Sequence, residues 1–322
     1  HPGPRVRRRE LLRALAGVPL LRFPGQGQPR RQSPLGSRDL ALVERWSWAM
    51  GQAVRLRLFC GSVAAGAEAA QAAFAELRRV EALLSRFEEG SALSELNRQA
   101  GSRPWRAPTE LLAVLSAAAK VRGMTGGAFD VAVEPLMRVW GFREPRETLP
   151  LPQEVAEAEA AVRAAVVLVG EGTIHLPARH TRLDLGGIGV GYGLDRAASV
   201  LRARGVGSAL LEVSGDLIAM GAPPGQDGWA VDVVDSADPA RRPLSVTLRD
   251  RALATSAARG ATVRLGAVER GHLMDPRGDG RKSGARQATV VAPSALLADA
   301  LSTAAVVSGR AAPGPVETWI FT

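Results

Sequence analysis

The sequence lacks several residue types on which common structures and sites depend. Cys60 is its only cysteine, so the chain can form neither an internal disulfide nor a site with several cysteine ligands. After residue 21 no segment contains the roughly 18 apolar residues that a membrane-spanning helix needs. A single tyrosine in 322 residues leaves little for base stacking, which proteins that bind nucleic acid often use. Apolar residues are abundant, at 46% of the chain, which is enough for a sizeable buried core.

Positive charge is concentrated near the N-terminus. The net charge is +9, but residues 1–45 hold ten arginines against three acidic residues and so account for +7 of it. The remaining 277 residues carry only +2 and show no basic stripe. We therefore expect no nucleic-acid partner.

The basic N-terminal segment has features of a targeting signal. Residues 6–21, VRRRELLRALAGVPLL, place paired arginines before a short apolar run, as in twin-arginine export signals. The alternative interpretation is a basic, disordered tail. We expect residues 1–45 to lie outside the folded domain, and an export signal would place the protein on the periplasmic or cell-envelope side.

From residue 46 to 322 the sequence predicts one domain of the α+β class, with an antiparallel or mixed sheet and flanking helices. Strand-like runs are few in the first half, where 53–60 is the clearest, and numerous between residues 165 and 292. Helical spacing of apolar residues predicts helices over 64–87, 109–123, 129–142 (interrupted by Pro135), 152–165 and 294–307.

Residues 184–195, DLGGIGVGYGLD, form a glycine-rich turn before a predicted helix. The glycines match neither the G-x-G-x-x-G dinucleotide fingerprint nor the Walker pattern, since no G-K-[ST] occurs. The bare backbone and the helix N-terminus would still favour a bound phosphate. A tight turn with glycines for steric reasons is the alternative.

Acidic and hydroxyl side chains recur near turns and on one helix. Asp299 and Thr303 are four residues apart on a predicted helix, so both face the same side and could bind Mg²⁺ beside phosphates. Alternatively, Asp299 interacts with the helix dipole and Thr303 is merely packed. His272 and Asp275 lie at a Pro/Gly turn, where a structural histidine is equally possible. Asp216 is interpreted as a structural turn residue.

Taken in order, these stretches resemble one family, the FAD:protein FMN transferases (ApbE-type flavin transferases). The resemblance covers residues 48–308 and includes the N-terminal pair MGQAV and LLSRFEEGSALSELNRQ. The further matching segments are TGGAFD, LDLGGIGVGYGLDRAASVLRARGV, LLEVSGDLIAMG, LATS, HLMDP and VVAPSALLADALST.

The resemblance implies a reaction. Such enzymes bind FAD with Mg²⁺, cleave its diphosphate and transfer the FMN moiety to a threonine or serine of an acceptor protein, releasing AMP. Acceptors would be exported redox proteins, membrane-associated ones among them, with a segment of the pattern D-x-x-[ST]-G-A-[ST]. Because the reaction is a phosphoryl-type transfer, positioning and charge neutralisation would do most of the catalysis.

The resemblance also implies roles for individual residues. The implied metal ligands are Asp299, Thr303 and the backbone carbonyl of Gly187. The implied FAD-binding residues are Met50, Ala128, Phe129, Asp130, Asp184, Val190 and His272. His272 would also act as a base toward the acceptor hydroxyl, and Asp275 in the same segment is the second catalytic candidate.

The clearest departure from the family pattern is at position 190. Val190 stands where a lysine is usual, and valine cannot pair with a phosphate. A protein that binds or carries flavin without transferring it, or one that only hydrolyses FAD, therefore remains an alternative. A generic metal-dependent phosphohydrolase is a further alternative.

Overall fold

A seven-stranded antiparallel sheet forms the centre of the molecule. The computed structural model describes residues 21–22, 40–240, 242–278 and 284–322. The strand order in this sheet is β15-β14-β11-β8-β7-β3-β2, and every neighbouring pair is antiparallel. Its strands are β2 (Ala41–Ala49), β3 (Gln52–Cys60), β7 (Ser208–Val213), β8 (Asp216–Met220), β11 (Arg251–Ala257), β14 (Gln287–Ala292) and β15 (Glu317–Phe321). The predicted α+β class is confirmed.

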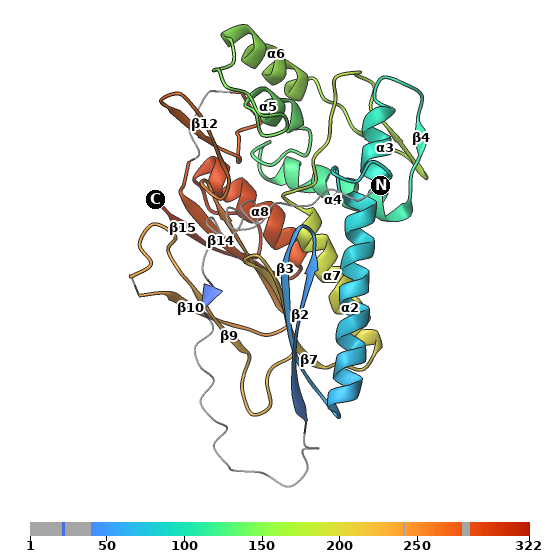
Figure 1. Cartoon of the computed structure of the whole chain (residues 1–322), viewed down its shortest axis with the longest axis vertical. Coiled ribbons are helices and arrows are strands. Elements are labelled where there is room, and N and C mark those ends of the chain that lie inside the picture. The colour runs from blue at the N-terminus through green and yellow to red at the C-terminus, as the bar shows by residue number, and fades with distance from the viewer. Residues whose placement is uncertain (1–20, 23–39, 241, 279–283) are drawn as a thin grey trace.

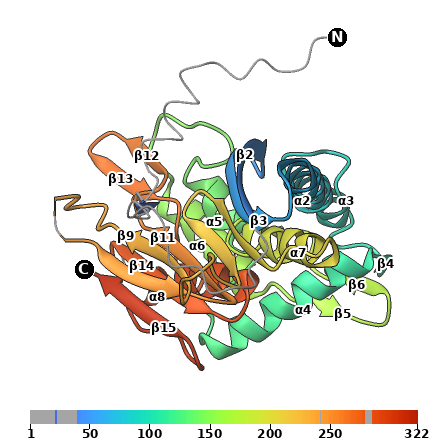
Figure 2. The same ribbon diagram turned by 90° about the horizontal axis from the view of Figure 1, so that it is seen from below.

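Three helices pack on one face of this sheet (Figures 1 and 2). They are α2 (Val63–Leu84), which contacts β2 and β3, α7 (Gly189–Ala203), which contacts β7 and β8, and α8 (Ala295–Ser308), which contacts β11 and β14. Side chains alternate between the two faces of a strand. Leu211 and Val213 of β7 therefore point into the helix-covered core, while Leu210, next to Leu211, points to the other face.

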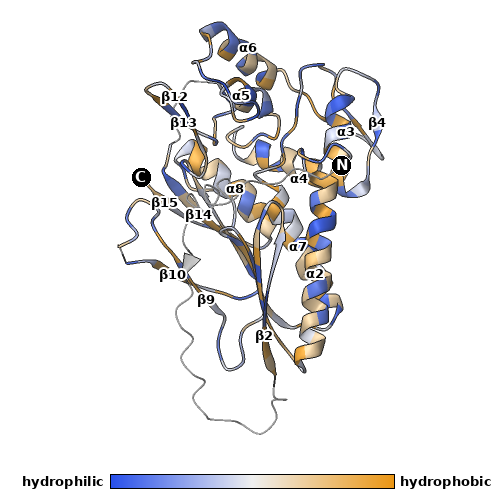
Figure 3. Cartoon of the chain, in the orientation of Figure 1, coloured by the Kyte–Doolittle hydropathy of each residue, from blue (hydrophilic) through white to orange (hydrophobic). Residues whose placement is uncertain are grey.

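The opposite face of the sheet is partly covered by a small second sheet. This sheet has the order β1-β9-β10, formed by β1 (Leu21–Arg22), β9 (Trp229–Val233) and β10 (Leu244–Leu248). Trp229, which is fully buried, packs between the two sheets with Leu210 and Leu253. The apolar residues thus form a two-layered core, as the orange segments in Figure 3 illustrate.

The remaining elements surround one end of the central sheet (Figure 1). They are the helices α3 (Ala92–Arg98), α4 (Thr109–Met124), α5 (Glu134–Val139) and α6 (Pro152–Arg163), the short strands β4 (Trp105–Arg106), β5 (Leu168–Val169) and β6 (Thr173–His175), and the hairpin of β12 (Thr262–Leu265) and β13 (Val268–Gly271). None of the helices in the described part of the chain combines the length and apolar character of a transmembrane span.

The structure corrects two sequence-based predictions. Strand β2 begins at Ala41, because alternation in ALVERWSWA buries Val43 and Ala49, and Leu21–Arg22 pair with β9. Parts of residues 1–45 therefore belong to the fold, before the predicted boundary at residue 46. The predicted helix over 129–142 is a turn followed by α5, in which Pro135 stands in the first turn rather than interrupting a longer helix. The predicted export signal, apart from Leu21, lies outside the described residues.

Candidate functional site

A cavity of about 900 Å³ opens where the glycine-rich turn, α8 and the β2–β3 turn meet. Its lining includes every residue that the sequence predicted for FAD or metal binding. These residues are Met50, Ala128, Phe129, Asp130, Asp184, Gly187, Val190, His272, Asp299 and Thr303. Segments from Met50 to Thr303 therefore converge on one site, and of the predicted site residues only Asp275, described below, lies outside this lining.

The glycine-rich turn ends at the start of α7, where the chain packs closely against α8. A Cβ atom at Gly191 would collide with the backbone carbonyl of Ala295, so only glycine fits there. A Cβ atom at Gly187 would lie 3.1 Å from Oγ1 of Thr303. The backbone of the turn thus lies directly against the hydroxyl that the sequence predicts as a metal ligand.

Oxygen atoms that could bind a metal lie at the α8 side of the cavity. Asp299 is 5% exposed, and its Oδ2 accepts a hydrogen bond of 3.0 Å from the amide of Gly191. Burial raises the pKa of Asp299 to about 7, and the nearby Asp195 carboxylate adds to this rise. Burial together with the charge of Asp299 also raises the pKa of Asp216, which lines the same cavity.

This donor set fits Mg²⁺. Asp299, the Thr303 hydroxyl and the backbone of Gly187 offer hard oxygen ligands, and a cation would offset the cost of burying two neighbouring carboxylates. The described residues contain no group of three or more His, Cys, Asp or Glu side chains that could hold a metal. Mg²⁺ is commonly bound by one or two carboxylates with substrate phosphates and water, so a sparse protein donor set suits it.

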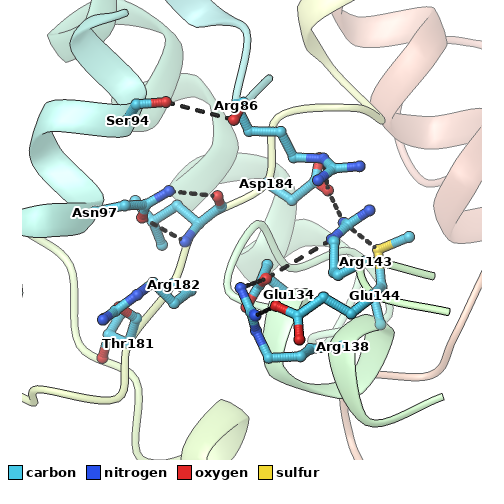
Figure 4. Close-up of polar contacts among 12 residues, drawn as sticks. Arg86, Ser94, Asn97, Glu134, Arg138, Arg143, Glu144, Thr181, Arg182 and Asp184 are labelled. Carbon is cyan, nitrogen blue, oxygen red and sulfur yellow. Dashed lines mark hydrogen bonds and ion pairs between the residues drawn. The ribbon is translucent and has the colours of Figure 1, made fainter. Parts of the chain in front are cut away.

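Asp184, at the other end of the glycine-rich turn, is held by two arginines (Figure 4). Its Oδ2 pairs with Nη2 of Arg143 and lies 3.2 Å from Nε of Arg86. Its Oδ1 accepts a hydrogen bond of 2.7 Å from the amide of Gly186. The carboxylate therefore fixes the turn and both guanidinium groups at once.

Two of the predicted flavin-contacting segments are fixed by backbone hydrogen bonds. The amides of Met50 and Gly51, which have φ of 57° and 69°, donate to the carboxylate of Glu81 on α2. Oδ1 of Asp130 accepts from the amide of Ala132, and its Oδ2 pairs with Nε of Arg122 at 2.6 Å. Each of these carboxylates holds a turn at the cavity wall.

His272 follows strand β13 and lies in the cavity wall. Its Nδ1 lies 3.2 Å from the amide nitrogen and 3.3 Å from the carbonyl oxygen of Ala261. In the tautomer whose Nδ1–H donates to that carbonyl, Nε2 of His272 has a free lone pair. Burial lowers its pKa, so the imidazole is neutral near pH 7 and can accept a proton. This arrangement is compatible with the predicted role as a base.

Asp275 is not among the residues that line the cavity. Its Oδ1 accepts from the amide of Arg277, and its Oδ2 pairs with Nη2 of the same residue at 2.5 Å. The carboxylate therefore stabilises the turn after His272. Its predicted catalytic role has no support in this geometry, because the side chain is committed to its own loop.

The cavity also contains residues that the sequence did not single out. Arg86 and Arg143 line it, and Asp216, interpreted from the sequence as a turn residue, lines it as well while accepting the amide of Thr255. Arg143 stands in an irregular stretch with no recognisable motif. The one available signal was its place directly after a predicted helix.

Comparisons with known proteins agree on one group. The model of the ApbE family matches residues 50–314. The FAD:protein FMN transferase of Treponema pallidum is 30% identical over 84% of this chain and 82% of its own length. The FAD:protein FMN transferase of Vibrio cholerae is 30% identical over 73% of this chain and 71% of its own. Among solved structures, the ApbE protein of Thermotoga maritima superposes with a TM-score of 0.75 at 26% identity, covering 84% of this chain and 87% of that one.

Proposed function

The chain belongs to the ApbE family and is a flavin transferase, and from this premise we propose that it moves the FMN moiety of FAD onto a threonine or serine hydroxyl of an acceptor protein. The reaction would depend on Mg²⁺ and release AMP. The observation that carries the proposal is the single cavity in which the glycine-rich turn, the oxygen donors of α8 and His272 meet.

The cavity suits a large anionic substrate. A volume of about 900 Å³ is at the upper end of the usual range for small-molecule sites, as a dinucleotide requires. Its walls combine apolar surfaces at Met50, Phe129 and Leu273, which suit a flavin ring, with charged groups at both ends of the glycine-rich turn.

The chain's own residues support the transfer chemically. The acceptor oxygen would form a bond to the FMN phosphorus, the bond from that phosphorus to the bridging oxygen would break, and AMP would leave with that oxygen. The hydroxyl proton would pass to the neutral imidazole of His272. Asp299, Thr303 and the Gly187 carbonyl would hold Mg²⁺, which when bound supplies positive charge to diphosphate oxygens. The rigid turn and α8 would keep these groups in place.

The acceptor and the compartment follow from the same proposal. The expected partner is an exported redox protein, which could be associated with the membrane. It would accept FMN on a threonine or serine in a segment of the pattern D-x-x-[ST]-G-A-[ST]. The twin-arginine-like segment at residues 6–21 supports a periplasmic or cell-envelope location.

The test is incubation of the purified protein with FAD, Mg²⁺ and a peptide of that pattern, followed by mass spectrometry of the peptide and measurement of AMP. We expect the peptide to gain the mass of FMN less water, with one AMP released per transfer. Release of AMP and free FMN without labelled peptide would instead indicate an FAD pyrophosphatase. Flavin binding with neither product would indicate a flavin carrier.

Two variants test the metal ligands in the same assay. Asp299→Ala is expected to abolish transfer, because it leaves only the Thr303 hydroxyl and a carbonyl for the metal. Thr303→Val removes a ligand at nearly constant volume, whereas Thr303→Ser keeps the hydroxyl and should retain most activity. Unchanged turnover in Asp299→Ala would place the metal elsewhere.

A further inference from the structure

Acidic residues outnumber basic residues in the lining of the cavity. Six of them carry carboxylates, and only Arg86 and Arg143 carry a permanent positive charge. Two of the carboxylates, Asp216 and Asp299, lie on the α8 side, where the metal donors gather. An anionic part of a substrate that is not bound through a metal therefore has one favourable place in this lining, beside the two arginines.

The guanidinium of Arg143 is buried, and one of its nitrogens lacks a hydrogen-bond acceptor. Its side chain is 6% exposed, and its Nε has no hydrogen-bond acceptor, since Oε1 of Glu134 lies 3.7 Å away. Its Nη2 pairs with Asp184 and also lies 2.8 Å from the sulfur of Met137, which is a weak acceptor. Burying a guanidinium with unfilled donors is costly unless something else completes them.

Arg86 approaches the same point from another element. It follows α2, and its Nε lies 3.2 Å from Oδ2 of Asp184. Burial lowers the pKa of Arg86 to about 10 and lowers that of Arg143 as well, so both charges are held at a desolvation cost that an anion would offset. Figure 4 shows both guanidinium groups converging on Asp184.

Asp184 positions the pair. Its two oxygens are taken up by the arginines and by the amide of Gly186. Of the charged groups that meet here, the two guanidinium groups and this carboxylate line the cavity. On the far side, Glu134 pairs with Arg138 at 2.9 Å, and Arg138 pairs with Glu144, so that second carboxylate is already shared.

We propose that Arg143 and Arg86 form a phosphate-binding subsite that takes diphosphate oxygens of the dinucleotide substrate. This inference rests on the proposed function. The glycine-rich turn then lies between a cationic pair at Asp184 and the oxygen donors around Asp299. Both arginines line the cavity, and guanidinium groups suit phosphate oxygens better than a neutral ring carbonyl.

The experiment measures binding rather than turnover. Binding of FAD, inorganic pyrophosphate and riboflavin is measured by calorimetry in the presence of EDTA, for the wild type, Arg143→Gln and Arg86→Gln. The matched control is Arg138→Gln, which removes an arginine that shares Glu134 with Arg143 but does not line the cavity. Near-ultraviolet circular dichroism checks the fold of each variant.

We expect each of the two cavity variants to weaken binding of FAD and of pyrophosphate by about tenfold to a hundredfold, in line with the loss of charge-assisted hydrogen bonds. Riboflavin, which has no phosphate, should bind with unchanged affinity, and Arg138→Gln should bind all three ligands like the wild type. Arg143→Lys should recover part of the loss, because it keeps the charge without the fork.

Other results would overturn the inference. Equal losses for riboflavin and FAD would mean that the arginines support the flavin ring or the fold, and no loss would mean that they touch no phosphate. If Arg143→Gln does not fold, Arg86→Gln carries the same comparison, since that side chain is less buried. A wild type that binds pyrophosphate but binds FAD neither in EDTA nor with Mg²⁺ would refute the proposed function while leaving an anion site at the two arginines standing. A wild type that binds neither would refute both.

Discussion

Asp195 and Asp299 each accept hydrogen bonds from the first turn of the helix that carries the other. Asp195, in α7, accepts from the amides of Ala295 and Leu296 at the start of α8, at 2.8 and 3.0 Å. Asp299, in α8, accepts from the amide of Gly191 in the first turn of α7. Both carboxylates thereby satisfy amides that a helix leaves unpaired at its N-terminus, and they fix the two helix starts against each other.

Removing one of these reciprocal contacts should cost stability and loosen the metal site. Asp195→Ala leaves two amides without their carboxylate, so we expect a loss of about 2–4 kcal/mol in the free energy of unfolding. Asp195→Asn keeps an acceptor oxygen and should lose less. Urea unfolding measures both. A loss below about 0.5 kcal/mol in Asp195→Ala would show that water replaces the contact.

The close approach of α7 and α8 makes Gly191 the most sensitive glycine of the site. In Gly191→Ala the added methyl group would meet the backbone of Ala295, which cannot move aside as a side chain could. We expect a loss of about 3 kcal/mol or more in thermal or urea unfolding, together with weaker FAD binding. The control is Gly123→Ala in α4, where the new methyl group has open space and should stabilise the helix by about 0.5–1 kcal/mol. Wild-type stability in Gly191→Ala would contradict the packing described here.

A lysine at position 190 should improve FAD binding. Val190 lines the cavity, and the nearby Arg196 does not supply a charge there because it pairs with Glu76 at 3.1 Å. We expect Val190→Lys to tighten FAD binding about tenfold, as a charge-assisted hydrogen bond to a phosphate would. Fluorescence titration measures this, with Val190→Met as the uncharged control. Weaker binding with an intact fold would mean that the turn is built around an apolar contact at this position.

The ion pairs of Glu76 should make stability depend on acidity. The Arg79 guanidinium, with Arg196 as a second partner, lowers the pKa of Glu76 to about 2 from its ordinary value of 4.5. Because the pKa of Glu76 is lowered in the folded state, the ionised carboxylate stabilises the fold fully above about pH 4.5. This stabilisation is lost as the pH falls toward 2. We expect Glu76→Gln to lose about 1–3 kcal/mol at pH 7, discounted for the exposure of Arg79, and the difference from the wild type to vanish near pH 2.

Urea unfolding at pH 7, 4 and 2.5 measures this dependence. Glu68→Gln, an exposed position on the same helix, is the control and should stay within about 0.5 kcal/mol of the wild type. A constant difference between Glu76→Gln and the wild type at all three pH values would show that the loss is one of packing rather than of charge.

The sequence predicted the parts of the site that depend on local patterns. In α8 the Ser294 cap and the apolar spacing define the helix, and the interval of four between Asp299 and Thr303 brings both into the cavity. The glycine-rich turn was recognisable as a close backbone approach, although the sequence could not show that its partner is Ala295 of another helix.

Contacts between distant segments could not be predicted in this way. Arg86, which follows α2, and Arg143, which follows α5, meet at Asp184 on the glycine-rich turn, and no local pattern encodes that meeting. Pro135 was read as a break within a helix, while the structure uses it at the start of α5, where its missing amide costs nothing. From the sequence Asp216 is interpreted only as a turn residue. In the structure it follows a turn and also lines the cavity, and the turn pattern alone could not show this second role.

The backbone contact between Gly191 and Ala295 also sets how the site can fluctuate. Since α7 and α8 belong to the same buried core as the central sheet, their starts cannot separate without exposing that core. Native-state hydrogen exchange divides a protein into segments that open alone and segments that open only on complete unfolding. We expect the amides of Gly191, Ala295 and Leu296 to belong to the second kind, so deuterium should reach them no faster than the whole domain unfolds.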